Sequence, residues 1–354
     1  MKILYVIEHI SAEGGLERIL IDKMNALSED EAFEISLLTV WKDTHAPAFP
    51  VSQRIERNCL EISCPTSSYG FFAVLSRVLS AYNSAVRRLS PDIVVYFRAV
   101  GAFLAAFSSW KGRSIFETHS ARQYCNHRWL YPLMERKVDA VVCLTRGDAR
   151  QYNRASRVEV IPNFTCMPSL AEAQQHRGRR HCSFIGRLCK EKDPMRLLAL
   201  WRKIVGRVPG WTLDIYGGGE FEEQMKEYIR RSDLSESVVM HGFVRDVFPV
   251  YAGTDILLLT SVTEGLPMVI IEAMRCGVPV VSTDCPYGPA EVILDGRTGI
   301  LVLPADDAAY VDAVCRLMQD AELRKSMGRE AMECSRQYGR AEIVGRWKRL
   351  FSEL

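Results

Sequence analysis

Two glutamates interrupt an otherwise apolar stretch of the sequence, TSVTEGLPMVIIEAMRCGVPVVSTD (residues 260–284). Glu264 lies in a predicted loop, and Glu272 lies two turns inside the short helix that we predict after it. A carboxylate in such a largely buried helix is costly in free energy unless donors hydrogen-bond to it. We therefore expect Glu272 to accept hydrogen bonds from two hydroxyls, such as those of a ribose, and Glu264 to accept from sugar hydroxyls. The alternative is that Glu272 forms an ion pair with Arg275 or Arg297.

The start of the same helix is a predicted anion site. Pro267 suits the first helical position, and Gly265 and Leu266 precede it. The backbone N–H groups at a helix N-terminus have no partner within the helix, and together with the helix dipole they attract anions. The loop and the helix start therefore predict a contact with the charged part of a ligand.

Two cations follow a predicted strand in FIGRLCKEKD (184–193). Gly186 at the strand end leaves room for an anion against the backbone. Arg187 and Lys192 both reach such an anion, the arginine as a planar fork and the lysine as a point charge. A glycine beside two cations suits a diphosphate. The alternative is a pair of surface cations that open a helix.

Two further glycine clusters stand between a strand and a helix. Gly217 begins the run Gly217–Gly219 in IYGGGEFEEQ, and Gly14 and Gly15 lie in HISAEGGLERIL. Glycines permit sharp turns and a close approach of a ligand, although a plain strand-to-helix turn explains the run at 217 equally well. His119 follows a strand end in FETHSARQY and is either a functional or a structural histidine.

The elements that position these residues alternate between short apolar strands and amphipathic helices, a pattern typical of parallel α/β sheets. A chain of 354 residues is too long for one compact core, so we expect two doubly wound domains. Open sheets of this kind bind ligands at the carboxyl ends of their strands. The expected strands lie at residues 2–8, 34–40, 92–97, 114–118, 140–145 and 158–162, and then at 181–188, 211–217, 237–243, 255–261, 278–284 and 299–303.

The domain boundaries follow from one polar segment. Residues 166–180 are polar and end in a basic cluster, so we expect a linker there. The N-terminal Rossmann-like domain is then 1–165 and the C-terminal one 181–339. A helix at about 340–354 would pack back on the N-terminal domain.

Composition excludes several functional classes. The net charge of +2 gives no argument for nucleic acid. The eleven cysteines form no C-x-x-C and no zinc spacing, so we predict a reducing cytosol and no metal site. No apolar run is long enough to span a membrane.

The ordered set of motifs resembles a retaining glycosyltransferase of the GT-B class, family four, in its bacterial polysaccharide and lipid-linked oligosaccharide branch. Glu264 and Glu272 form the E-x7-E pair of that family. The matching motifs are G-G-x-E-R (14–18), E-x-H (117–119), V-I-P-N-F (160–164), G-R-L-x-x-x-K (186–192), H-G-F-V (241–244), E-G-L-P-M-V-I-I-E-A (264–273) and Y-G-P-A-E-V-I-L-D-G-R-T-G-I-L-V-L-P (287–304). The chain departs from the family at Phe164 and Asp193, where glycine is common.

The resemblance implies a role for each matching residue. The catalytic set would be His119, Arg187, Lys192 and Glu264, with the two cations binding the donor diphosphate in place of a metal. Glu272 would hold the ribose. The remaining donor-binding residues would be Gly14, Gly15, Gly186, Gly217, Gly242, Phe243, Val244, Gly265, Leu266, Pro267, Met268 and Val269.

The resemblance also implies a reaction. A hexose or N-acetylhexosamine would pass from a UDP-sugar to a saccharide acceptor, which we expect to be carried on polyprenyl diphosphate. The reaction would be a front-face substitution with retained configuration and no cofactor. Double displacement through Glu264 is the alternative mechanism. We expect a cytoplasmic protein, peripheral on the anionic inner membrane, with residues 71–89 and 122–137 as the contacts; core helices with solvated faces are the alternative.

Three other functions compete with this one. A nucleotide-sugar epimerase of the same fold needs acid and base groups that the sequence does not place. A dinucleotide-dependent oxidoreductase lacks its G-x-G-x-x-G. A non-catalytic sugar-nucleotide-binding protein would have little use for all of Arg187, Lys192, Glu264 and Glu272.

Overall fold

The computed structural model describes residues 1–11, 15–42, 45–65, 68–119, 122–125, 127–165 and 178–354. The chain divides into two compact units, each described by itself below. Unit 1 comprises Met1–Phe164 and Arg340–Leu354, and unit 2 comprises Thr165–Gly339. Most of the expected linker, residues 166–177, lies outside the described residues.

Unit 1 is built on a parallel sheet with the strand order β3-β2-β1-β4-β5-β6-β7 over the described residues. Its strands are Lys2–Ile7 (β1), Glu34–Trp41 (β2), Glu56–Ile62 (β3), Ile93–Phe97 (β4), Arg113–Glu117 (β5), Ala140–Cys143 (β6) and Val158–Val160 (β7). Its helices are Gly15–Leu27 (α1), Ser68–Leu89 (α2), Arg98–Phe107 (α3), Tyr131–Met134 (α4), Arg146–Ala149 (α5) and Arg340–Glu353 (α14), with 3-10 turns Arg122–Tyr124 (η1) and Arg128–Leu130 (η2).

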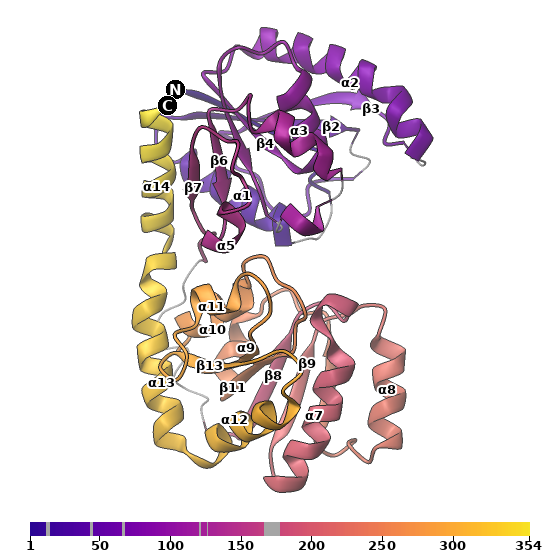
Figure 1. Ribbon diagram of the computed structural model, residues 1–354, viewed down its shortest axis with the longest axis vertical. Coiled ribbons are helices and arrows are strands. Elements are labelled where there is room, and N and C mark those ends of the chain that lie inside the picture. Colours follow the sequence, from indigo (N-terminus) through magenta and orange to yellow (C-terminus); the bar gives the residue numbers. More distant parts are fainter. Residues whose placement is uncertain (12–14, 43–44, 66–67, 120–121, 126, 166–177) are drawn as a thin grey trace. The chain divides into compact units, whose positions relative to one another are not determined.

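Side chains of β1 alternate between the two faces of this sheet, as the period of a strand requires. Tyr5 packs into a core with α1 and α14, whereas Leu4 packs into a second core with α2 and α3. The C-terminal helix α14, drawn in yellow in Figure 1, belongs to unit 1. Its Trp347 and Phe351 are buried in the first of these cores. Its surface ion pairs join Arg340 to Glu29 and Lys348 to Asp30.

Unit 2 repeats the architecture with the strand order β10-β9-β8-β11-β12-β13. Its strands are His181–Ile185 (β8), Thr212–Tyr216 (β9), Val238–Gly242 (β10), Ile256–Leu259 (β11), Val280–Thr283 (β12) and Gly299–Val302 (β13). Its helices are Pro194–Arg207 (α7), Glu222–Arg231 (α8), Phe248–Gly253 (α9), Met268–Arg275 (α10), Pro289–Val292 (α11), Asp307–Gln319 (α12) and Ala321–Cys334 (α13), with 3-10 turns Lys190–Lys192 (η3) and Ser335–Tyr338 (η4).

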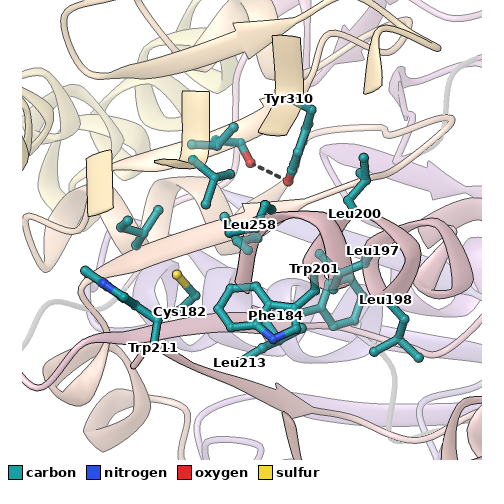
Figure 2. Close-up of a cluster of buried hydrophobic side chains, with 14 of the residues drawn as sticks. Cys182, Phe184, Leu197, Leu198, Leu200, Trp201, Trp211, Leu213, Leu258 and Tyr310 are labelled. Atoms are coloured by element: carbon teal, nitrogen blue, oxygen red, sulfur yellow. Dashed lines mark hydrogen bonds between the residues drawn. The ribbon is translucent and has the colours of Figure 1, made fainter. Parts of the chain in front are cut away.

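Each face of the second sheet also has its own core. On one face α7, α8 and α12 pack around Trp201 and Phe184 (Figure 2). In the same core the Tyr310 hydroxyl lies 3.1 Å from the Leu259 carbonyl oxygen and 3.2 Å from that of Val281, and it donates to them. On the other face α10 and α13 pack around Tyr251 and neighbouring apolar side chains. Both sheets are therefore parallel and covered by helices on both faces, which confirms the predicted α/β fold with two Rossmann-like domains.

The twelve expected strands are all present, with ends that differ by a few residues, and one strand was not predicted. The missed strand is β3, which forms one edge of the first sheet and is mostly exposed. Its sequence, ERNCLEI, lacks the apolar run that marks a strand covered on both faces.

Candidate active site

The loop after β8 holds three predicted site residues. Gly186 follows the strand, Arg187 is exposed, and Lys192 ends η3. The next residue, Asp193, has a φ of 45° and accepts a hydrogen bond from the Arg196 backbone, so it is the N-cap of α7. Aspartate is one of the few residues that tolerate this left-handed conformation, which explains how it replaces the glycine of the family.

Lys192 and Glu264 form an ion pair between the loops that follow β8 and β11. Lys192 Nζ donates to Glu264 Oε1 at 2.5 Å, and Ser261 Oγ donates to the same oxygen at 2.6 Å. The side chains of Glu264 and Lys192 are only 8% and 20% exposed. Burial, and then the charge of Glu264, raises the pKa of the nearby Cys285 thiol to about 12, so this thiol stays protonated. The structure thus joins Lys192, which the sequence assigned to the diphosphate, to Glu264, which it assigned to the sugar hydroxyls.

Gly217 and Gly219 are required by the contact between two loops. At Gly217 (φ 137°) a Cβ atom would lie 1.9 Å from the Gly186 carbonyl oxygen, and at Gly219 (φ 155°) it would lie 2.4 Å from that of Leu188. Backbone N–H groups of Gly186 and Leu188 donate across the same contact at 2.9 Å. These glycines therefore hold the β8 loop, with Arg187 and Lys192, against the β9 loop.

The start of α10 differs from the prediction by one residue. The helix begins at Met268, and Pro267 is its N-cap with ψ 92° rather than its first helical residue. Glu272 consequently lies just over one turn, not two turns, inside the helix. The loop before the helix is held by a residue that the sequence analysis did not single out, because a Cβ at Gly288 (φ 95°) would lie 2.6 Å from the Gly265 carbonyl oxygen.

Glu272 is half-buried, and its interaction with a tyrosine was not foreseen. The Tyr251 hydroxyl, which α9 supplies from the core, donates to Glu272 Oε2 at 2.7 Å. Of the arginines considered as partners, Arg275 donates to the Ser335 carbonyl at 3.2 Å, and Arg297 pairs with Glu330. The tyrosine orients the carboxylate that the sequence assigned to the ribose.

The segment predicted to flank the nucleobase begins at a β-bulge at the end of β10. The strand register shifts around His241, and Gly242 has a φ of 72°. The side chain of Phe243 is 65% exposed, and Val244 is half-buried. His241 Nε2 lies 2.7 Å from the buried Asp214 carboxylate, and the His241 ring stacks on Tyr216 at 4.4 Å. The segment therefore has a rigid support that its own sequence did not reveal.

In unit 1, Gly14 lies outside the described residues. Gly15 is the first residue of α1, and a Cβ there would meet nothing within 4 Å. His119 follows β5, its side chain is 10% exposed, and its ring stacks on Phe97 with centroids 5.6 Å apart. His119 Nε2 lies 2.9 Å from Glu117 Oε1.

Over the described part of the chain, no three His, Cys, Asp or Glu side chains are grouped to hold a metal ion. Metal independence stays a prediction. Within the same residues, none of the helices has the length and hydropathy needed to cross a bilayer.

Comparison with known proteins supports the family resemblance. Residues 179–320, which include the whole Lys192–Glu264 site, match the family described as glycosyl transferases group 1. The match lies within unit 2 and covers less than half of the chain. It confirms the resemblance to GT-B glycosyltransferases of family four, whereas the retained configuration stays a prediction.

Two curated relatives match this chain over nearly their whole length. The amylovoran biosynthesis glycosyltransferase AmsD of Erwinia amylovora is 26% identical over 360 residues, which cover 98% of this chain and 98% of AmsD. The second is the GalNAc-alpha-(1->4)-GalNAc-alpha-(1->3)-diNAcBac-PP-undecaprenol alpha-1,4-N-acetyl-D-galactosaminyltransferase of Campylobacter jejuni. It is 25% identical over 365 residues, which cover 100% of this chain and 99% of the relative.

Among solved structures, Anabaena HepE in complex with UDP-glucose is similar to this chain over 100% of both chains, with a TM-score of 0.76 and 18% identity. At this level of identity the likeness establishes the fold, and it agrees with the two Rossmann-like sheets described above.

Proposed function

We propose that this protein is a glycosyltransferase that transfers a hexose or an N-acetylhexosamine from a UDP-sugar to a saccharide acceptor on polyprenyl diphosphate, with retained configuration and without a metal ion. The observation that carries the proposal is the Lys192–Glu264 pair, which lies beside the exposed Arg187 at the carboxyl ends of β8 and β11. Strand ends of this kind are the ligand sites of open α/β sheets.

The pair suits a ligand with a sugar next to a diphosphate. A lysine ammonium has three N–H donors, so Lys192 can hold Glu264 and a phosphate oxygen at the same time. Arg187 adds a planar fork for the diphosphate, and Glu264 retains acceptor sites for sugar hydroxyls. Glu272, oriented by Tyr251, would accept from the ribose, and Phe243 would lie against the base.

In the proposed reaction the bond between the anomeric carbon and the diphosphate oxygen breaks while an acceptor oxygen bonds to that carbon on the same face. The leaving phosphate oxygen takes the acceptor proton. Negative charge grows on the diphosphate as the bond breaks, and the two cations stabilise it. The same-fold epimerase and the non-catalytic binding protein are disfavoured by the group 1 match and by the Lys192–Glu264 pair.

The donor and the acceptor rest on the relatives. UDP-glucose is bound by HepE, and the Campylobacter relative is named for an undecaprenyl-diphosphate-linked saccharide. AmsD is named as a glycosyltransferase of amylovoran biosynthesis, and this similarity favours a role in surface polysaccharide biosynthesis. We place the reaction at the cytoplasmic face of the inner membrane because a polyprenyl chain partitions into the bilayer.

Calorimetry with UDP, GDP and ADP in EDTA tests the donor site. We expect selective binding of UDP, weakened roughly tenfold by Glu272→Gln because the neutral amide is a poorer acceptor for the ribose hydroxyls. Selective binding of GDP or ADP would overturn the assigned donor. If none of the three nucleotides binds, the donor-site assignment fails.

Release of UDP from a panel of UDP-hexoses and UDP-N-acetylhexosamines tests the reaction. Arg187→Ala and Lys192→Ala should each lower turnover about a hundredfold, since each removes charge stabilisation from the leaving diphosphate. Lys203→Ala is the matched control, an exposed cation of α7 in the same unit. Normal turnover in both site variants, or activity that EDTA abolishes and Mg²⁺ restores, would contradict the two-cation scheme.

A further inference from the structure

Glu117 lies at the end of β5 and is almost completely buried, with a 1% exposed side chain. Its two carboxylate oxygens have different partners. Oε2 accepts a hydrogen bond from Lys23 Nζ of α1, and Oε1 lies 2.9 Å from His119 Nε2. One buried carboxylate therefore joins a buried lysine to the histidine that is assigned to the catalytic set.

Lys23 is held in place by three aromatic rings. Its Nζ lies 4.2 Å from the ring centroid of Trp347, 5.2 Å from that of Phe97 and 5.5 Å from that of Tyr5. Burial lowers the pKa of the Lys23 ammonium, whereas the charge of Glu117 and its hydrogen bond favour the charged form. The faces of the three aromatic rings also attract a cation. Trp347 comes from α14, which makes the C-terminal helix part of the support.

The charge state of Glu117 follows from these neighbours. Burial alone would raise the pKa of its carboxyl, but the Lys23 ammonium, His119 and their hydrogen bonds outweigh burial and lower it. Glu117 is therefore ionised at neutral pH. An ionised carboxylate can only accept hydrogen bonds, so the proton in the His119–Glu117 bond is on Nε2.

From this geometry we infer that Glu117 and Lys23 are positioning residues that fix His119 as the Nε2–H tautomer. In neutral His119 the remaining ring nitrogen, Nδ1, then carries a lone pair and can only accept a hydrogen bond. No hydrogen bond to Nδ1 is formed within the described residues. His119 would thus accept a hydrogen bond from a hydroxyl of the sugar substrate, an inference that rests on the function proposed above.

Nitrogen-15 NMR of the imidazole groups of the ligand-free protein reads the tautomer directly. We expect the wild type to show His119 as the Nε2–H form. Glu117→Gln alone leaves the Lys23 ammonium buried without its counter-charge, so we expect this variant to be strongly destabilised. The double variant Glu117→Gln/Lys23→Met removes both charges with little change of volume, and we expect a mixture of the two tautomers.

The matched control is Tyr5→Phe. The Tyr5 hydroxyl is buried in the same cluster and has no hydrogen-bond partner among the described residues, so its removal leaves the charge pair intact. Tyr5→Phe should keep the Nε2–H tautomer and the wild-type turnover. The double variant should lose at least tenfold in kcat with a smaller change in KM for the UDP-sugar.

Three results would overturn the inference: an Nδ1–H tautomer in the wild type, an unchanged tautomer in the double variant, or an unchanged kcat in that variant. The NMR result needs no substrate. A wild-type protein that turns over no UDP-sugar would thus refute the proposed function, while the tautomer assignment would still be decided by the spectra.

Discussion

At the scale of single residues, Gly217 is a position at which the backbone leaves almost no room for a side chain. A Cβ would lie 1.9 Å from the Gly186 carbonyl oxygen, and the φ of 137° is itself strained for any other residue. Gly217→Ala should therefore lower the free energy of unfolding by about 2 kcal/mol or more. It should also weaken UDP binding, because the loop that carries Lys192 is displaced. Urea denaturation and calorimetry measure the two effects.

Gly206→Ala provides the control for this prediction. Gly206 is an exposed residue of α7, and a Cβ there meets nothing within 4 Å. This substitution should raise the free energy of unfolding by about 0.5–1 kcal/mol, because alanine has less conformational freedom in the unfolded chain. Equal effects of the two substitutions would show that the loop contact at Gly217 is unimportant.

Sequence spacing identified Lys192 and Glu264 as candidate site residues, but it did not predict their ion pair. The pair depends on the adjacency of β8 and β11, which are separated by two other strands in the sequence. Tyr251 was missed for a related reason. It lies in the apolar helix α9, and the sequence of that helix does not indicate that the Tyr251 hydroxyl donates to Glu272. Gly288 was quoted only as part of a motif, since its close contact is with a distant loop.

At the scale of elements, the two segments considered as membrane contacts differ. In α2, Val78 and Tyr82 are buried in the core, and Val74 and Leu79 are partly buried against it. By contrast, Trp129 of η2 and Leu133 of α4 are 60% and 42% exposed. The second segment is therefore the better candidate for contact with an anionic bilayer, and its exposed cations are Arg128, Arg136 and Lys137.

Vesicle sedimentation tests this element. The wild type should bind vesicles that contain anionic lipid, and Trp129→Ser/Leu133→Ser should weaken the binding severalfold because less apolar surface enters the bilayer. Arg77→Ala, at an exposed position of α2, should leave the binding nearly unchanged. Binding by the double variant equal to that of the wild type would exclude this segment as the contact.

The elements themselves were largely predictable because most strands are covered on both faces and read as apolar runs. The exception, β3, is an edge strand whose exposed residues resemble a loop. The N-terminal start of α10 illustrates a second limit. A proline suits either the N-cap or the first helical position, so the sequence left its start uncertain by one residue.

At the scale of the whole molecule, unit 1 is made from two segments that are far apart in the sequence. The chain leaves unit 1 at Phe164, completes unit 2, and returns with Arg340–Leu354 to contribute to the first core. Each unit has its own cores, so a change in α14 should act on unit 1 alone. The packing of α14 against α1 in this core also brings Trp347 next to Lys23.

Phe351→Ala tests this connectivity in the intact protein. Phe351 is completely buried in the core with α1, and its truncation should lower the free energy of unfolding of unit 1 by about 3–5 kcal/mol. Hydrogen exchange should show faster exchange in β1, β4 and α1, with the protection of β8–β13 unchanged. Arg349→Ala, at a side chain that is 66% exposed, is the control on the same helix. A comparable loss of protection in β8–β13 would show that the two units do not unfold independently, because the damage at α14 would then have reached a core to which Phe351 does not belong.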